Sequence, residues 1–203
     1  MLLNFRITVL FFALPVLANA QPPGAEPFRR SYAAEAAGDY ATALTALDGV
    51  GRCDSDYVCV LRRGWLLYLA GRHPEAAAAY QRAIQLEAEA TEPRLGLMLP
   101  LLAQRRWREA EQQARAILAL VPSESTARGR LAYIHYSQGR FDLAEGEYRR
   151  LVQESPANVD LRAGLAWSLL KQRRFVDARA QLERILACAP DHASAKQGLA
   201  LLP

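Results

Sequence analysis

The strongest constraint on this chain is an internal repeat with a period of about 34 residues. Four segments align without gaps, and they begin at Gly71, Arg105, Gly139 and Arg173, which are evenly spaced along the chain. A similar, earlier segment begins at Gly38, almost one full period before Gly71. A fixed period of this length over most of a chain is typical of a solenoid, in which one supersecondary unit is stacked many times.

Each aligned segment has the pattern of a turn, a helix and a helix stop. An aromatic ring or a histidine stands two residues after the start, and an alanine follows three residues later. In three units a proline ends the helix, because proline cannot continue one. Since an apolar stretch with helical spacing also precedes each turn, every unit is predicted to be a helical hairpin. These positions hold Tyr40, His73, Trp107, Phe141 and Phe175, then Ala43, Ala76, Ala110, Ala144 and Ala178, and finally Pro122, Pro156 and Pro190.

At these residues the chain resembles the tetratricopeptide repeat family, whose unit is two antiparallel helices of this length. The small residue of the first helix also matches, as Ser31, Gly64, Ala132 and Ala166. The resemblance implies an all-α fold, a right-handed superhelical solenoid of helical hairpins over residues 21–203. It places about five units near 24–56, 57–90, 91–124, 125–158 and 159–192, followed by a C-terminal capping helix in 193–203.

The first twenty residues are predicted to be a secretory signal peptide. Arg6 precedes an apolar run of about 12 residues, and Ala18-Asn19-Ala20 supplies the small residues that a signal peptidase reads. The alternative is an uncleaved membrane anchor, but the run is shorter than the roughly 20 residues that span a bilayer. We therefore expect cleavage after Ala20 and a periplasmic location.

Two of the three cysteines are predicted to form a disulfide. Cys53 and Cys59 are six positions apart in a polar stretch between two helical patterns. Export would place them in an oxidising compartment, where such a pair is typically bridged. Two free thiols are the alternative, and a metal site is disfavoured because no second Cys or His pair has usable spacing. Cys188 lies in an apolar run and is expected to be a buried small hydrophobe.

The resemblance also implies a concave binding face, because the first helices of such arrays line the inner surface. The inward ninth and twelfth positions are mostly aromatic or aliphatic along the chain, and arginines stand at the sixth position. Aromatic and arginine side chains anchor many protein interfaces. The alternative is that the same rings pack between neighbouring first helices as part of the core. The predicted groove consists of Tyr32, Trp65, Tyr68, Leu99, Tyr133, Tyr136 and Trp167, with Arg62 and Arg130 at its edge; Arg29 shares their sixth position, and Glu35 stands at a twelfth position.

Enzymatic, metal and nucleic-acid functions are not favoured. The three histidines fall in different units, and the chain lacks a His-Glu-x-x-His pair and a Gly-rich phosphate loop. Glu109/Glu111 and Glu145/Glu147 are expected to be solvated outer faces rather than an acid/base couple. The formal net charge of +4 is small and spread along the chain, which does not argue for nucleic acid. We expect no catalytic residues, no metal and no cofactor.

The expected function is that of a non-enzymatic scaffold or adaptor in the periplasm. Its partner would be a protein or peptide of the cell envelope, within an assembly or export complex, and it would meet membranes only through partners. The carboxylate clamp by which some tetratricopeptide domains hold chaperone tails is absent, because its positions hold Leu61, Trp65, Leu95 and Leu99. Two alternatives remain open: a polysaccharide-binding component of an exopolysaccharide export system, and a chaperone-like binder of unfolded exported proteins, as in cytochrome c maturation.

Overall fold

The computed structural model describes residues 25–203, and over this range every regular element is a helix. The predicted signal peptide, with its cleavage after Ala20, lies outside the described residues. Two short 3₁₀ turns, η1 (Leu47–Gly49) and η2 (Cys53–Ser55), separate the first pair of helices from the rest. The α-helices are α1 (Ala25–Ala36), α2 (Tyr40–Ala46), α3 (Tyr57–Leu69), α4 (His73–Leu86), α5 (Glu92–Ala103), α6 (Trp107–Leu120), α7 (Ser125–Ser137), α8 (Phe141–Glu154), α9 (Val159–Lys171), α10 (Phe175–Cys188) and α11 (Ala193–Ala200).

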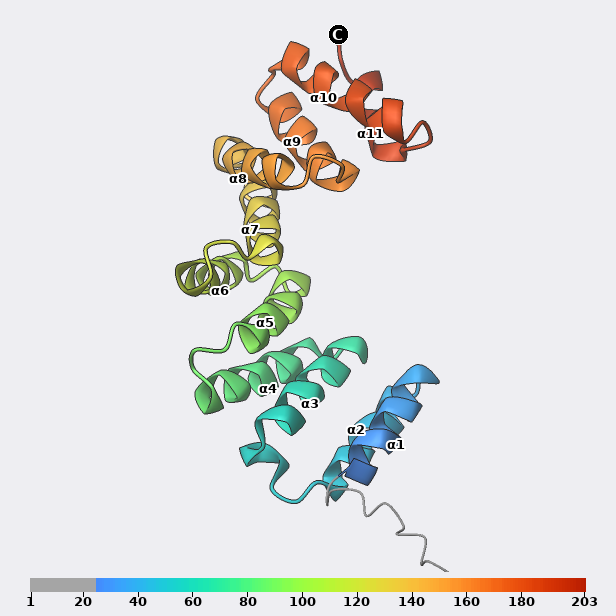
Figure 1. The fold of residues 1–203 in the computed structure, drawn as a ribbon, viewed down its shortest axis with the longest axis vertical. Coiled ribbons are helices and arrows are strands. Elements are labelled where there is room, and N and C mark those ends of the chain that lie inside the picture. The colour runs from blue at the N-terminus through green and yellow to red at the C-terminus, as the bar shows by residue number, and fades with distance from the viewer. Residues whose placement is uncertain (1–24) are drawn as a thin grey trace, which may run out of the picture.

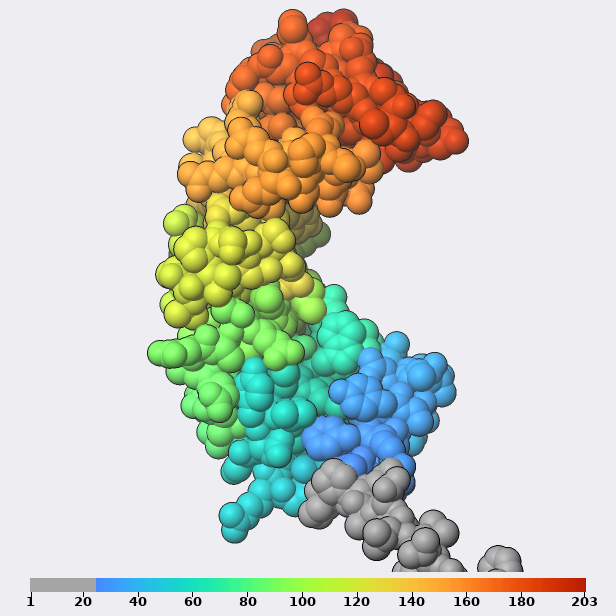
Figure 2. All heavy atoms as spheres, in the orientation of Figure 1, coloured from blue at the N-terminus to red at the C-terminus, as the bar shows by residue number. Residues whose placement is uncertain are grey.

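The helices stack in chain order into an elongated, curved array. Each helix packs on the next one along the chain, and the first helices also meet across units, as α3 does with α5 and α7 with α9. Figure 1 shows this succession from α1 at one end to α11 at the other, and Figure 2 shows the curved outline, hollowed between the two ends. The predicted all-α solenoid of helical hairpins is confirmed.

Small residues allow the close approach of neighbouring helices. The recurrent alanine of the second helix is fully buried in all five units, at Ala43, Ala76, Ala110, Ala144 and Ala178. Two glycines of first helices are each covered by a tyrosine ring of the preceding second helix. A Cβ atom at Gly96 would lie 2.2 Å from Cε1 of Tyr80, and one at Gly164 would lie 2.5 Å from Cε1 of Tyr148. The second pair lies two repeats after the first, so the contact is part of the repeat.

Three arginines make the same set of hydrogen bonds in successive repeats, and the sequence patterns do not identify them. Arg94, Arg128 and Arg162 stand one repeat apart near the start of α5, α7 and α9. Each donates hydrogen bonds to a backbone carbonyl that precedes it and to a side chain on the following second helix. The carbonyls are those of Ala88, Pro122 and Pro156, at 3.1, 2.6 and 2.7 Å, and the side chains are Gln113, Glu147 and Gln181, at 3.1, 2.8 and 2.9 Å.

The turn inside each hairpin requires a left-handed backbone conformation. Gly38, Gly71 and Gly139 supply it with φ of 76°, 72° and 76°, which costs glycine little because it has no Cβ. Arg105 and Arg173 occupy the equivalent turns with φ of 55° and 60°. An L-residue with a side chain is strained in this region, so two of the five turns carry a local penalty.

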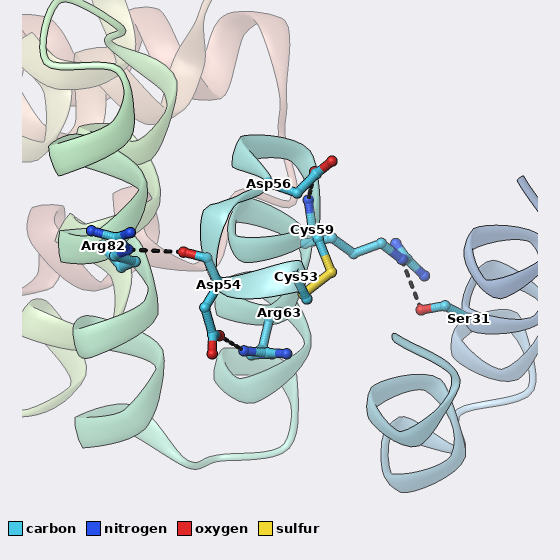
Figure 3. The surroundings of a disulfide bond; sticks show 8 residues. Ser31, Cys53, Asp54, Asp56, Cys59, Arg63 and Arg82 are labelled. Atoms are coloured by element: carbon cyan, nitrogen blue, oxygen red, sulfur yellow. Dashed lines mark hydrogen bonds and ion pairs between the residues drawn. A yellow bond between two sulfur atoms is a disulfide. The ribbon is translucent and has the colours of Figure 1, made fainter. Parts of the chain in front are cut away.

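A disulfide closes the connection between the first two hairpins. Cys53 of η2 and Cys59 of α3 are bonded, with their Cα atoms 5.3 Å apart, and both are buried. Figure 3 shows the surrounding polar contacts: Asp56 caps α3 by accepting from the Cys59 N–H at 2.8 Å, and Arg82 of α4 donates to the Asp54 carbonyl at 2.9 Å. The bridge and these bonds fix the start of α3.

The expectation that Cys188 is buried is wrong. Its side chain is exposed at the last residue of α10. The apolar run from Ile185 to Cys188 spans a full helical turn, so the residues point in different directions, and Ile185 alone is fully buried.

Candidate binding groove

Eight of the nine predicted groove residues lie in two separate pockets along the first helices. The N-terminal pocket, of about 530 Å³, is lined by residues of α1, α3, α5 and α7, with the buried Tyr80 ring of α4. The C-terminal pocket, of about 350 Å³, is lined by α7, α8, α9 and α11. Of the predicted residues, Tyr32, Arg62, Trp65, Leu99 and Arg130 line the first pocket, and Tyr133, Tyr136 and Trp167 line the second.

Exposure of these rings decides between a groove and a core. Tyr32, Trp65 and Tyr133 are 57%, 37% and 49% exposed, which is high for large aromatic side chains. Tyr136 and Trp167 are half-buried. Tyr68 is also half-buried and lies outside the lining of both pockets, with its ring centroid 5.9 Å from that of Trp65. The most exposed rings are therefore free to contact a ligand.

The positive charge of Arg62 is already used inside the protein. This side chain is buried, donates to Ser31 Oγ at 2.8 Å and pairs with Glu35 at 2.9 Å. Its guanidinium also lies 3.4 Å from the centre of the Tyr32 ring. Glu35 in turn accepts a hydrogen bond from Trp65 Nε1 at 2.7 Å. This network fixes the rings at the mouth of the N-terminal pocket, which makes Arg62 a positioning residue rather than a free cation.

Arg130, unlike Arg62, does not pair with a carboxylate within residues 25–203. Its side chain is half-buried at the N-terminal pocket, and its Nη1 donates to the Leu95 carbonyl of α5. Burial lowers the pKa of Arg130. Arg29, at the same register of the first unit, pairs with Glu26, whereas no ion pair among the described residues includes Arg130.

The C-terminal pocket is aromatic and carries no charged side chain in its lining. Tyr148 from α8 joins the three predicted rings, and α11 contributes Ser194 and Gln197. The Trp167 Nε1 donates to Ser194 Oγ at 2.8 Å, which ties α9 to the capping helix. Burial raises the pKa of Tyr148 to about 12, so its phenol is neutral at physiological pH. The sequence reasoning missed Tyr148, although its register with Tyr80, opposite a first-helix glycine, was a visible signal.

Of the four glutamates expected on solvated faces, Glu109 is exposed, whereas Glu111 and Glu145 connect neighbouring units. Glu145 is buried and accepts from Arg149 and Arg174, and Glu111, one repeat earlier, accepts from Arg115 and Arg140. The hydrogen bond from Arg140 is the main cause that lowers the pKa of Glu111 to about 2. The expectation that Glu145 is solvated is wrong, because an arginine from the next hairpin covers it. Both glutamates tie consecutive units together.

Within residues 25–203, no cluster of three or more His, Cys, Asp or Glu side chains has an arrangement that would hold a metal ion. No helix in the same range is long and apolar enough to cross a membrane.

Comparison with known proteins identifies the repeat. Three family models, each described as a tetratricopeptide repeat, match residues 59–89, 100–159 and 135–202. The chain belongs to the tetratricopeptide repeat family. No curated protein matches the sequence significantly.

Solved tetratricopeptide structures share this fold. MamA from Desulfovibrio magneticus RS-1 is 14% identical, with a TM-score of 0.76 over 85% of this chain and 99% of that one. YrrB, described as a TPR protein with an unusual peptide-binding site, is 15% identical, with a TM-score of 0.73 over 86% and 91%. A tetratricopeptide repeat protein from Parabacteroides merdae ATCC 43184 is 15% identical, with a TM-score of 0.78 over 87% and 70%. At these identities the likeness concerns the fold.

Proposed function

We propose that this tetratricopeptide protein is a non-enzymatic adaptor that holds a segment of a partner protein in its concave groove. The fold is that of a protein-interaction scaffold, and family members bind protein or peptide partners rather than catalyse reactions. The single observation that carries the proposal is the set of exposed rings, Tyr32, Trp65 and Tyr133, at the mouths of two pockets. Large rings left in water on one face are typical of interaction sites.

We further propose that the adaptor works in the periplasm, within an envelope assembly or export complex. Two features support this location. The sequence of residues 1–20 has the pattern of a cleavable secretory signal. The buried Cys53–Cys59 bridge is of the kind that persists in oxidising compartments.

In-cell photo-crosslinking tests the proposal. A photoreactive amino acid replaces Trp65 or Tyr133 in the native host, and adducts are identified by mass spectrometry. Val176, which is 84% exposed on α10 and lies outside both pocket linings, is the matched control position. One dominant protein adduct at both groove positions, and not at Val176, is expected. Equal labelling at all three positions would argue against the groove, and many unrelated adducts would favour a chaperone of unfolded chains.

The C-terminal pocket favours one second candidate, a polysaccharide ligand. Its four rings together with Ser194 and Gln197 are the types of side chain that stack on sugars and bind their hydroxyl groups. Soluble oligosaccharides should then quench the fluorescence of Trp167, and Trp167→Phe should abolish the response. If the fluorescence does not change on addition of oligosaccharides, the polysaccharide candidate is excluded and a protein partner remains the proposed ligand.

A further inference from the structure

Arg130 is the predicted groove arginine that forms no ion pair among the described residues. A guanidinium has five N–H donors, and Arg130 uses one of its nitrogens, in a bond to the Leu95 carbonyl. Arg62, in the same pocket, has a hydroxyl, a carboxylate and a ring as partners, and its remaining nitrogen, Nη2, is buried without a hydrogen-bond partner. Nε and Nη2 of Arg130 are not among the fully enclosed unpaired atoms, and the side chain lines the pocket. A half-buried cation without a counter-charge is unfavourable unless a ligand supplies one.

The acids that share the N-terminal pocket do not neutralise Arg130. Glu35 is occupied by Arg62 and by Trp65 Nε1. Glu92 accepts a long hydrogen bond of 3.4 Å from the Tyr57 hydroxyl and forms no ion pair with Arg130. Glu124, which is outside the pocket lining, favours the charged form of Arg130 but forms no ion pair with it. No carboxylate among the described residues is therefore within ion-pair distance of Arg130.

The surface around Arg130 is apolar. Leu61, Leu95, Leu99 and the Tyr80 ring line the same pocket. Its volume of about 530 Å³ is within the range of ligand pockets and accommodates a few side chains of a peptide. A ligand that fills it and pairs with Arg130 combines apolar groups with a negative charge.

We propose that Arg130 binds the carboxylate of an Asp or Glu side chain in the partner segment, while flanking apolar side chains of that segment pack on Leu95 and Leu99. The inference rests on the proposed peptide-binding function. Arginine binds carboxylates through two parallel N–H bonds, which gives both energy and orientation. A single carboxylate fits better than a phosphate group, because a doubly charged ligand needs a second free cation and Arg62 is already paired.

Selection of a displayed random peptide library on the mature chain tests the inference. Enriched peptides should carry Asp or Glu at one position flanked by apolar residues. A selected peptide should bind roughly tenfold or more weakly when that acid is changed to its amide. Selection on Arg130→Gln should lose the acidic preference and keep the apolar one. Arg29→Gln is the matched control, since Arg29 has the same register and is already paired with Glu26; it should leave the preference unchanged.

Arg130→Lys separates charge recognition from folding. Lysine retains the charge and loses the two-bond geometry, so a folded Lys variant, checked by circular dichroism, should keep a weakened preference for acid. Three results would overturn the inference and leave the binding function intact. The first is that the enriched peptides carry no acid. The others are that the preference for acid survives in Arg130→Gln, or that it is lost in a folded Arg130→Lys protein. A library that yields no binding peptides on any variant would instead refute the proposed function.

Discussion

Replacing Arg105 with glycine is expected to stabilise the protein. Arg105 has a φ of 55° in a turn where three other units place glycine at 72° to 76°. The left-handed region costs a residue with a Cβ about 1–2 kcal/mol. Glycine lowers the free energy of unfolding by about 0.5–1 kcal/mol, because it has more conformational freedom in the unfolded chain. The arginine side chain is exposed and makes no hydrogen bond or ion pair among the described residues, so no native contact offsets the gain. The net expectation is a gain of about 0.5–1 kcal/mol.

Urea unfolding followed by circular dichroism measures this difference. Arg105→Ala is the control, because alanine removes the charge and keeps the strained Cβ, and it should give no comparable gain. Arg173, with a φ of 60°, should respond in the same way. The gains of the two glycine substitutions should add in the double variant, because the turns lie two repeats apart. A neutral or destabilising Arg105→Gly, or an equal gain from alanine, would refute the assignment of strain to this turn.

Three further predictions concern the core, the disulfide and pH. Gly96→Ala should destabilise the fold by about 1–3 kcal/mol, because its Cβ would lie 2.2 Å from the Tyr80 ring; a variant as stable as wild type would contradict this packing. Removing the Cys53–Cys59 bridge by a double serine substitution should cost roughly 2 kcal/mol for so short a loop, and the mature protein should gain two hydrogens in mass on reduction. His135 is buried with a pKa lowered by desolvation, so the unfolded chain binds its proton more readily. Stability should therefore fall as pH drops below the ordinary histidine pKa of about 6.5, and His135→Gln should flatten that part of the profile.

The fold was predictable because its determinants are local. The repeat period, the turn glycines and the stop prolines each act within one hairpin, and stacking of neighbours completes the core. The buried alanines at equivalent positions show the same rule, since a small side chain is needed wherever two helices approach closely. The cysteine pairing also depends on local separation, and the structure joins the two residues that are six positions apart.

The groove was predictable as a face but not as a set of chemical roles. Arg29, Arg62 and Arg130 have the same register, yet Arg29 is paired on its own helix, Arg62 is buried in a network, and Arg130 forms no ion pair among the described residues. Their partners come from other positions, so identical registers acquire different environments. The register of Glu35 places it on the inner face, but its bonds to Arg62 and Trp65 depend on how α1 lies against α3.

The sequence by itself determined the repeat, the helical hairpins and the side of the array that carries the rings. The tertiary structure decided which rings are exposed, that Tyr148 and α11 complete the C-terminal pocket, and that Arg130 is the groove arginine without an acidic partner among the described residues. The reason is physical. Helix periodicity is encoded over a few residues, whereas the pairing of a charge and the burial of a ring depend on side chains brought together from other helices by packing.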